Sequence, residues 1–225
     1  ENSAVTISAW IYPETGGEGG FGRIVNRSAT AFGPAIFLRD DGATLLRRIM
    51  FRVDGTTDLV IASNNNFITY NTWQHVLMTW DGSTTAANVH IYVDNSEVTY
   101  ATQTNGVTLN NNSGQTFIIG SEVADGTNTF DGQIDELAIW NTELTVAQIA
   151  LLANSRIKGI PLQIQTANLQ GYWPMDEGTH GNSADLDTAW DLSGNSNNGN
   201  PDNGADNLGC SWSSEVILSY PPKIQ

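Results

Sequence analysis

The chain has little cysteine, few basic residues and no long apolar run. Its 225 residues include a single cysteine, Cys210, so an internal disulfide cannot form. No apolar stretch reaches the roughly 20 residues that a membrane-spanning helix needs, so we expect no membrane insertion. A hydrophobic core must therefore hold the fold, and the length is ample for one large domain or two small ones.

Basic residues are scarce beside acidic ones. Nine Lys and Arg face 24 Asp and Glu, which gives a net charge of −15. Such a field repels phosphate backbones and anionic lipid, so nucleic acid is not an expected partner, whereas cations are attracted. Charged residues make up only 15% of the chain, so Asn, Thr, Ser, Gln and Gly must supply much of the surface. This composition is typical of proteins that work outside the cell, and we expect an extracellular or surface-exposed location.

Apolar residues recur at every second position in many short segments. In VTISAWIYP, residues 5–13, Val5, Ile7 and Ile11 alternate with polar or aromatic neighbours. Other short segments of this kind are PAIFLRD, RIMFRVD, TDLVIAS, TWQHVLMTWD, NVHIYVDN, SEVTYATQ, QTFIIGSE and GQIDELAIWN. Evenly spaced short strands with turn residues between them predict an all-β protein, either a sandwich or a barrel.

One helix is expected in TELTVAQIALLANS, residues 142–155. Thr145 and Gln148 have the spacing of a capping box, in which each side chain satisfies the backbone amide of the other residue. We predict a packing helix without chemistry of its own. The apolar residues that would cover a sheet edge or the end of the core are Leu144, Ile149, Leu151 and Leu152.

Three blocks of sequence resemble one known class of domain. They are NTWQHVLMTWDGSTTAANVHIYVDNSEV, FDGQIDELAIWNTELTVAQIALL, and GYWPMDEG together with DLSGNSNNG. In combination they resemble laminin-G-like and pentraxin-like domains, which are concanavalin A-like jelly rolls. The resemblance implies a two-sheet antiparallel β-sandwich with one short helix. We expect residues 1–225 to form a single domain in which residues 168–225 add late closing strands and loops, with the late strand beside residues 4–11.

The loop DLSGNSNNG, residues 191–199, has two readings. Asn, Asp, Ser and Gly are the residues that make tight polar turns. The resemblance instead implies a structural calcium ion where this loop meets the Ile-Asp-Glu strand, since calcium accepts six to eight oxygens in irregular geometry. The ligands would be Asp191, Ser193 and Asn195, with Asp135 as the distal ligand. Strand alternation predicts that Ile134 and Leu137 lie on different faces and that Glu136 faces away from Asp135.

A second metal candidate is the acidic loop GSEVADGTNTFDG, residues 120–132. In the pentraxin branch a similarly placed loop binds calcium, which then bridges to a ligand. Glu122 matches the first acid of that loop and Asp125 lies near the second. The earlier Asp-Asn pair that completes such a site has no clear counterpart around residues 30–33. Asp40 and Asp41 lie later in the chain and could replace it as ligand-binding residues only if the hairpin differs. A plain acidic loop is the alternative.

We expect a non-catalytic recognition or adhesion module, part of a larger multidomain protein or assembly. Its partner would be carbohydrate or a surface protein, bound by loops at one rim of the sandwich. Sugar sites need an aromatic platform and polar groups that orient hydroxyls, and Trp190 is the tryptophan that burial explains least. The alternative is a display or decoration domain on a cell surface or virus particle that binds no glycan.

A hydrolase of the laminarinase-like type is the remaining alternative. Retaining glycosidases need two carboxyl groups about 5–5.5 Å apart. Asp135 and Glu136 are adjacent, so strict alternation would send them to opposite faces of a strand. His75 and His90 fall within expected strands and have no nucleophile beside them in the sequence, so we expect structural roles for both and no enzyme.

Overall fold

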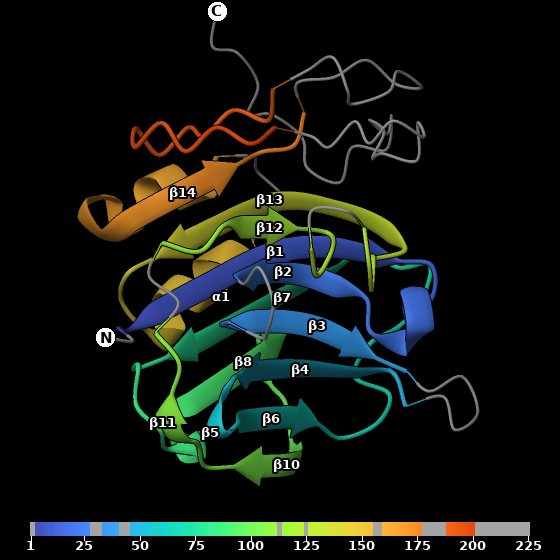
Figure 1. Ribbon diagram of the computed structural model, residues 1–225. Helices are drawn as coiled ribbons and strands as arrows, with labels where there is room; N and C mark the ends of the chain where they lie inside the picture. The colour runs from blue at the N-terminus through green and yellow to red at the C-terminus, as the bar shows by residue number, and fades with distance from the viewer. Residues whose placement is uncertain are drawn as a thin grey trace, which may run out of the picture.

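Two antiparallel six-stranded sheets pack face to face in the computed structural model (Figure 1). It describes residues 3–27, 33–40, 46–111, 114–123, 126–154, 159–176 and 188–200. The first sheet has the strand order β14-β13-β1-β7-β8-β9 and the second has β10-β6-β4-β3-β2-β12, with a separate ribbon of β11 and β5. The predicted two-sheet sandwich is confirmed.

The strands are short, and most lie within the predicted alternating segments. The strands at 23–27, 55–57 and 107–109 were not predicted, and SEVTYATQ contributes to two strands instead of one. The first sheet contains β1 (Val5–Pro13), β7 (Gln74–Trp80), β8 (Val89–Val93), β9 (Ser96–Glu97), β13 (Gly132–Trp140) and β14 (Leu169–Trp173). The second contains β2 (Arg23–Arg27), β3 (Ala35–Arg39), β4 (Arg48–Val53), β6 (Leu59–Ser63), β10 (Tyr100–Thr104) and β12 (Phe117–Ile119). The ribbon pairs β5 (Gly55–Thr57) with β11 (Val107–Leu109). Short 3-10 turns are η1 (Glu18–Gly20), η2 (Ala86–Asn88), η3 (Ile160–Gln163) and η4 (Thr166–Asn168).

The main core lies between the two sheets. Alternate residues of each strand point inward, such as Ile7 and Ile11 of β1 and Ile49 and Phe51 of β4, and these four are almost fully buried. The ring of Phe51 packs across the sandwich on Trp80, with 5.5 Å between ring centroids. The opposite side chains of each strand therefore form two outer faces, one on each sheet.

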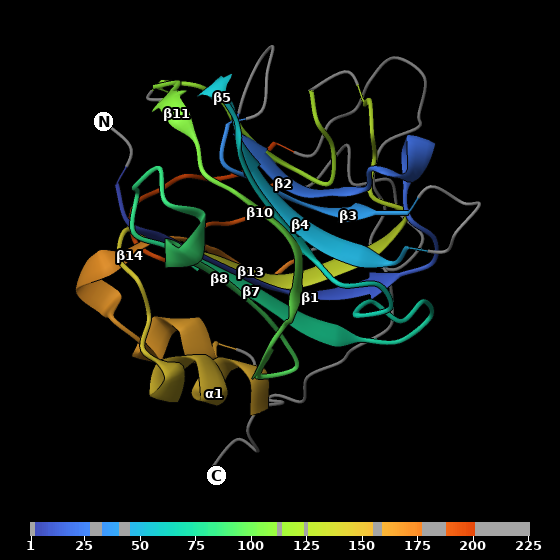
Figure 2. The same ribbon diagram turned by 90° about the horizontal axis from the view of Figure 1, so that it is seen from below.

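Helix α1 (Val146–Asn154) covers the outer face of the first sheet (Figure 2). The predicted capping box is present: the Thr145 amide donates to Gln148 Oε1 at 2.9 Å, and the Gln148 amide donates to Thr145 Oγ1 at 3.4 Å. Ile149 and Leu152 are buried against the sheet. The expectation for Leu151 is wrong, because this side chain points to solvent and is 59% exposed.

Strand β14 extends the first sheet at its edge, one strand further out than predicted. It pairs with β13 rather than with β1, since both sides of β1 are already taken by β7 and β13. The closing strand thus belongs to the same sheet. Residues 201–225, the end of the predicted closing segment, lie outside the described part of the chain.

A β-bulge interrupts β13. The register with β1 runs Ser8 to Ala138 and then Trp10 to Asp135, so one extra residue lies on β13 between these pairs. The backbone of Glu136 accommodates the extra residue with a φ of 52°, a value that residues other than glycine rarely adopt. The bulge shifts the alternation, and the prediction for the two apolar neighbours is wrong. The side chains that both pack against the inter-sheet core are Ile134 and Leu137.

Candidate functional site

Loop 191–199 is tied to the free edge of β14 by its own hydrogen bonds. Asp191 Oδ1 accepts the amides of Tyr172 and Ser193, each at 2.9 Å, and its Oδ2 accepts the amide of Asn197 at 2.9 Å. Burial raises the pKa of Asp191, but these bonds outweigh it and hold that pKa below its usual value. The carboxylate therefore acts as the organiser of a polar turn.

The amide side chains of the loop point to the same strand edge. Asn195 Nδ2 donates to the carbonyl of Leu169 at 2.8 Å, and Asn197 Nδ2 donates to the carbonyl of Gln170 at 2.8 Å. Ser193 Oγ also lies 3.4 Å from the Gln170 carbonyl. These contacts use N–H and O–H groups, so the loop covers an open sheet edge that would otherwise be free to pair with another strand.

Asp135 and Asp191 lie on opposite sides of β14. The loop bonds to the edge of β14 that faces away from β13, and Asp135 is on β13. Asp135 and Asp191 are therefore separated by about two strand spacings, or roughly 10 Å. Two ligand atoms of one calcium ion lie within about 5 Å of each other. In the described part of the chain, no group of three or more His, Cys, Asp or Glu is arranged to hold a metal ion. Calcium at this loop therefore stays a prediction. The loop's own hydrogen bonds account for the positions of its described side chains without an ion.

Asp135 and Glu136 both lie on the outer side of the first sheet, contrary to strict alternation. Asp135 pairs across the sheet with outward-facing Trp10. The Glu136 carboxylate accepts the Tyr172 hydroxyl at 2.8 Å and the amide of Gly159 at 3.1 Å. Burial raises the pKa of Tyr172 well above its usual range, and the negative charge of Glu136 adds to this. Both acids are almost fully buried, which supports a structural role at the bulge.

Glu122 is held by basic and amide groups of neighbouring elements. Its Oε2 accepts from Arg23 Nη2 at 3.2 Å and from Asn128 Nδ2, and its carbonyl accepts from Asn26 Nδ2 at 2.6 Å. The predicted partner Asp125 lies outside the described residues. Glu122 thus serves as the counter-ion of a fully buried arginine, and a metal role for it stays a prediction.

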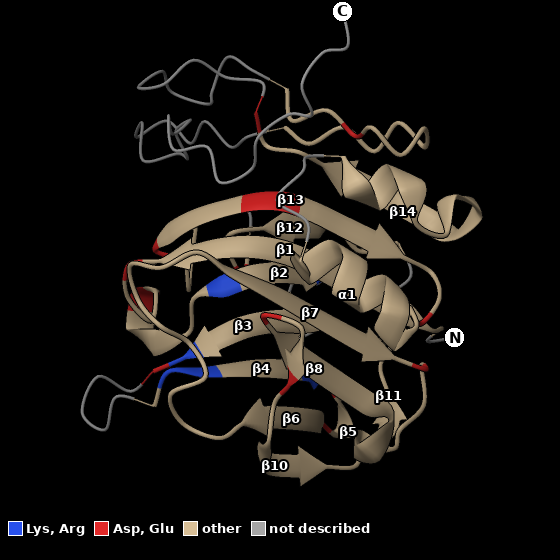
Figure 3. Ribbon diagram, turned by 180° about the vertical axis from the view of Figure 1, so that it is seen from behind, with Lys and Arg blue, Asp and Glu red and all other residues tan. Residues whose placement is uncertain are grey.

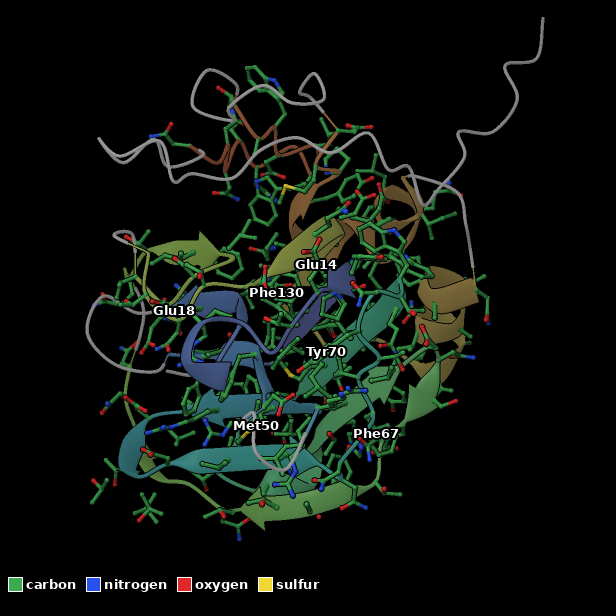
Figure 4. The ribbon with its side chains drawn as sticks, turned by 90° about the vertical axis from the view of Figure 1, so that its right-hand side faces the viewer. Glu14, Glu18, Met50, Phe67, Tyr70 and Phe130 are labelled. Atoms are coloured by element: carbon green, nitrogen blue, oxygen red, sulfur yellow. The ribbon has the colours of Figure 1, made fainter. Side chains whose placement is uncertain are left out.

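Asp40 is buried at the end of the sandwich. Its Oδ2 accepts the Tyr70 hydroxyl at 2.5 Å and its Oδ1 accepts the amide of Leu46 at 3.1 Å. Burial, reinforced by the bond to Asp40, raises the pKa of Tyr70 above its usual range. Figure 4 shows Tyr70 between Phe130 and Phe67, and all three pack against the inter-sheet core. Asp40 closes this end of the core, whereas Asp41 lies outside the described residues.

Trp190 is 51% exposed, beside Leu192 at 49%. It stands between Ala189 and Asp191, both buried, so its ring lies on the solvent side of the loop. This agrees with the expectation that burial does not account for it. Its role as a sugar platform stays a prediction.

His75 is a buried structural residue, as predicted. Its Nε2 lies 2.8 Å from Ser8 Oγ, and its ring meets Trp10 edge-on at 5.4 Å. Burial lowers the pKa of His75 to about 3, so the ring is neutral near pH 7. Ser8 and His75 are both nearly inaccessible, and this Ser-His pair therefore cannot reach a substrate.

The outer face of the second sheet carries a feature that the sequence reasoning missed. All six basic residues of the described chain lie between residues 23 and 52, on or beside β2, β3 and β4, where they appear blue in Figure 3. Alternation with the buried core residues turns several of them outward. The outward side chains of β3 and β4 are Ala35, Phe37, Arg39, Arg48, Met50 and Arg52. Among the described residues no helix packs over this face, whereas α1 lies against the other sheet (Figure 2).

Arginine and aromatic side chains are stacked on this outer face. The guanidinium of Arg39 lies 3.8 Å from the ring centroid of Phe21, and that of Arg23 lies 4.2 Å from the ring centroid of Phe37. Burial lowers the pKa of Arg23 to about 10, Glu122 opposes this shift, and the nearby positive charge of Arg52 adds to it. The face is therefore positive and partly aromatic, on a chain whose net charge is −15.

A laminin-G-type family model, described as the concanavalin A-like lectin/glucanases superfamily, matches residues 1–150. The chain belongs to this superfamily. The third block of the sequence resemblance, with loop 191–199, lies beyond the matched residues. No curated protein sequence matches the chain.

Two solved structures are similar to this chain. One is from Bacteroides ovatus, a protein whose assignment as carbohydrate-binding is itself provisional; it shares 20% identity over 87% of this chain with a TM-score of 0.54. The chain spans 51% of that protein's length. The other is the heptameric SAP-like pentraxin of Limulus polyphemus, with 17% identity, a TM-score of 0.44, and coverage of 71% of this chain and 73% of the pentraxin.

Proposed function

We propose that the protein is a non-catalytic carbohydrate-recognition module that works outside the cell as part of a larger protein or assembly. The observation that carries this proposal is the outer face of the second sheet. Phe37 is buried there, and the partly exposed side chains of β3 and β4 are Arg39, Arg48, Met50 and Arg52, which combine hydrogen-bond donors with an apolar group, as sugar sites do. Membership of a superfamily that includes lectins supports the same conclusion.

Two further features support recognition rather than catalysis. The adjacent acids of β13 are buried and engaged at the bulge, and the Ser-His pair is inaccessible.

No helix in the described residues is long and apolar enough to cross a bilayer. A surface protein remains the other candidate partner, reached through the exposed Trp190 and Leu192 of the 191–199 loop.

A glycan array tests the proposal. We expect selective binding to a limited set of glycans, weakened by Met50→Ala on the outer face of the second sheet. Trp190→Ala is the matched variant for the loop: loss of binding with this substitution alone would move the site from the sheet to the rim. No glycan hits with folded protein would overturn carbohydrate recognition and favour a display domain.

The calcium prediction has its own test, which is thermal unfolding with and without a chelator. Saturation at about 100 times the dissociation constant would stabilise the protein by roughly 2.7 kcal/mol. If the predicted ion is present, the chelator lowers Tm by several degrees, and Asp191→Asn abolishes that difference. Identical unfolding curves would leave loop 191–199 as a polar turn closed by its own hydrogen bonds.

A further inference from the structure

The outer face of the second sheet has a buried half and an open half. On the β2 and β3 side, Arg23 and Phe37 point outward but are 0% and 2% exposed, because the guanidinium of Arg23 lies over the Phe37 ring. A ligand of this face must therefore bind on the open half, across β4, β6 and β10. The outward side chains that are partly or fully exposed there include Met50, Arg52, Val60, Thr102 and Thr104.

The strand register places the outward side chains of the open half in two short rows. Neighbouring strands are about 5 Å apart, so each row of three residues spans roughly 10 Å. Ala62, in the middle of one row, is itself buried, so apolar contact with a ligand depends on Met50 and Val60, which are diagonal neighbours. From β4 through β6 to β10, one row is Arg52, Val60 and Thr104, and the other is Met50, Ala62 and Thr102.

An ion pair lies at one side of the open half. Arg52 Nη2 donates to Asp58 Oδ2 at 2.7 Å and lies 3.4 Å from Asp54 Oδ1. The side chains of Arg52 and Asp58 are each 31% exposed. The pair thus offers N–H donors and carboxylate oxygens side by side, which suits a hydroxyl group that both accepts and donates. Two carboxylates beside one guanidinium leave no excess positive charge to attract an anion.

The opposite side of the open half carries hydroxyl groups. Thr102 is half-buried and Thr104 is exposed, and within the described residues neither hydroxyl has a hydrogen-bond partner. Strands β6 and β10 contain no charged residue, and both are tan in Figure 3. The open half therefore has polar groups on two sides of an apolar surface and little net charge.

We propose that the open half binds a neutral saccharide. One sugar ring packs on Met50 and Val60. Its hydroxyls bond to the Arg52–Asp58 pair on one side and to Thr104 on the other, the combination of apolar surface and a few placed polar groups that ligand sites use. An acidic saccharide is disfavoured, because Arg52 is already compensated and the net charge of −15 repels anions. This inference rests on the proposed carbohydrate recognition and names its ligand class.

The three methionines of the chain give a local readout of where a sugar binds. Met50 belongs to the open half, Met78 is buried between the sheets, and Met175 follows β14, the strand that carries the 191–199 loop. The full chain, labelled with 13C at its methionine methyl groups, is titrated in NMR with two matched pairs of oligosaccharides. One pair is oligogalacturonate and its neutral methyl ester, and the other is deacetylated chitooligosaccharide, which is cationic, and its neutral N-acetylated form.

We expect at least one neutral form to bind more tightly than its charged match and to shift the Met50 signal, with the Met78 signal unchanged. Tighter binding of the charged forms would overturn this inference and leave carbohydrate recognition standing. A shift of Met175 without Met50 would do the same, since it would place the sugar near the loop. No binding here and none on the glycan array would overturn both.

A single hydroxyl tests the placement of the sugar. Thr104→Val keeps the shape of the side chain and removes its hydroxyl, so affinity for the best neutral saccharide should fall by roughly three- to tenfold, as expected for one hydrogen bond. Thr69→Val, at another exposed threonine outside the open half, should leave affinity unchanged. Tm should be unaltered in both variants. Unchanged affinity in folded Thr104→Val would overturn the proposed placement.

Discussion

The outer faces of the two sheets have the same strand geometry but opposite chemistry. On the first sheet, Trp140 and Tyr172 are buried under α1 and the turns that follow it. On the second, arginines alternate with apolar residues and no described helix covers them. One face has been incorporated into a second hydrophobic core, whereas the other keeps Met50 and the arginines of β3 and β4 partly exposed beside a buried Phe37. Function is therefore to be sought on the second sheet and stability on the first.

The largest expected difference between the faces comes from deleting a side chain on each. Trp140 is fully buried, and its Nε1 donates to the carbonyl of Ile164 at 2.8 Å. Trp140→Ala should lower the free energy of unfolding by about 3–5 kcal/mol, because it leaves a cavity and breaks that bond. Met50→Ala, the matched deletion on the half-exposed second face, should cost about 1 kcal/mol or less. Chemical denaturation measures both, and equal losses would contradict the division of roles.

The covered face should also make the protein acid-sensitive. The pKa of His75 falls to about 3 on burial, against about 6.5 when unfolded, so the unfolded chain binds more protons between these values. The contribution of His75 is complete above about pH 6.5 and declines by about 1.4 kcal/mol per pH unit as pH falls towards 3. His75→Gln should remove this slope from the stability–pH curve. His90→Gln, at the exposed pair with Glu97, is the control and should keep it.

A smaller effect is expected at the edge of the first sheet. Asp191→Ala leaves the amides of Tyr172, Ser193 and Asn197 without their acceptor, which should cost about 1–3 kcal/mol. Since the folded pKa of Asp191 is depressed, its charge stabilises the fold above the unfolded value near 4 and the benefit is lost as pH falls further. Asp81→Ala, a similar turn acid in an exposed loop, should cost much less. Equal effects would show that the 191–199 loop contributes no more than an ordinary turn.

Much of the architecture could be predicted from the sequence because it depends on local rules. Two-residue alternation predicted most of the strands, though not β2, β5 or β11, and the Thr145–Gln148 spacing predicted the start of α1. The bulge at Glu136 could not be found in this way. Its cause is tertiary: the Tyr172 hydroxyl and the Gly159 amide hold the carboxylate in place, and both lie far along the chain. One inserted residue was enough to reverse the predicted directions of Ile134 and Leu137.

The candidate site was less predictable for a different reason. The oxygen-rich loop predicted Asp191 and Asn195 as metal ligands. In the fold, their side chains instead bond to backbone amides and carbonyls of the edge strand β14, which the sequence does not place beside the loop. The arginines between positions 23 and 52 were visible as a cluster in an acidic chain. What the sequence could not supply was the register that sets Arg39 opposite Arg48.

That register leads to the smallest expected effect on stability. Arg39→Glu replaces a repulsive cross-strand pair with an attractive one, so the free energy of unfolding should rise by about 0.2–1 kcal/mol. Chemical denaturation measures the difference. Arg27→Glu, with an equal change in charge at the exposed end of β2, should leave the free energy of unfolding unchanged. A destabilised Arg39→Glu variant would mean that the stack of Arg39 on Phe21 contributes more to stability than the repulsion between Arg39 and Arg48 removes.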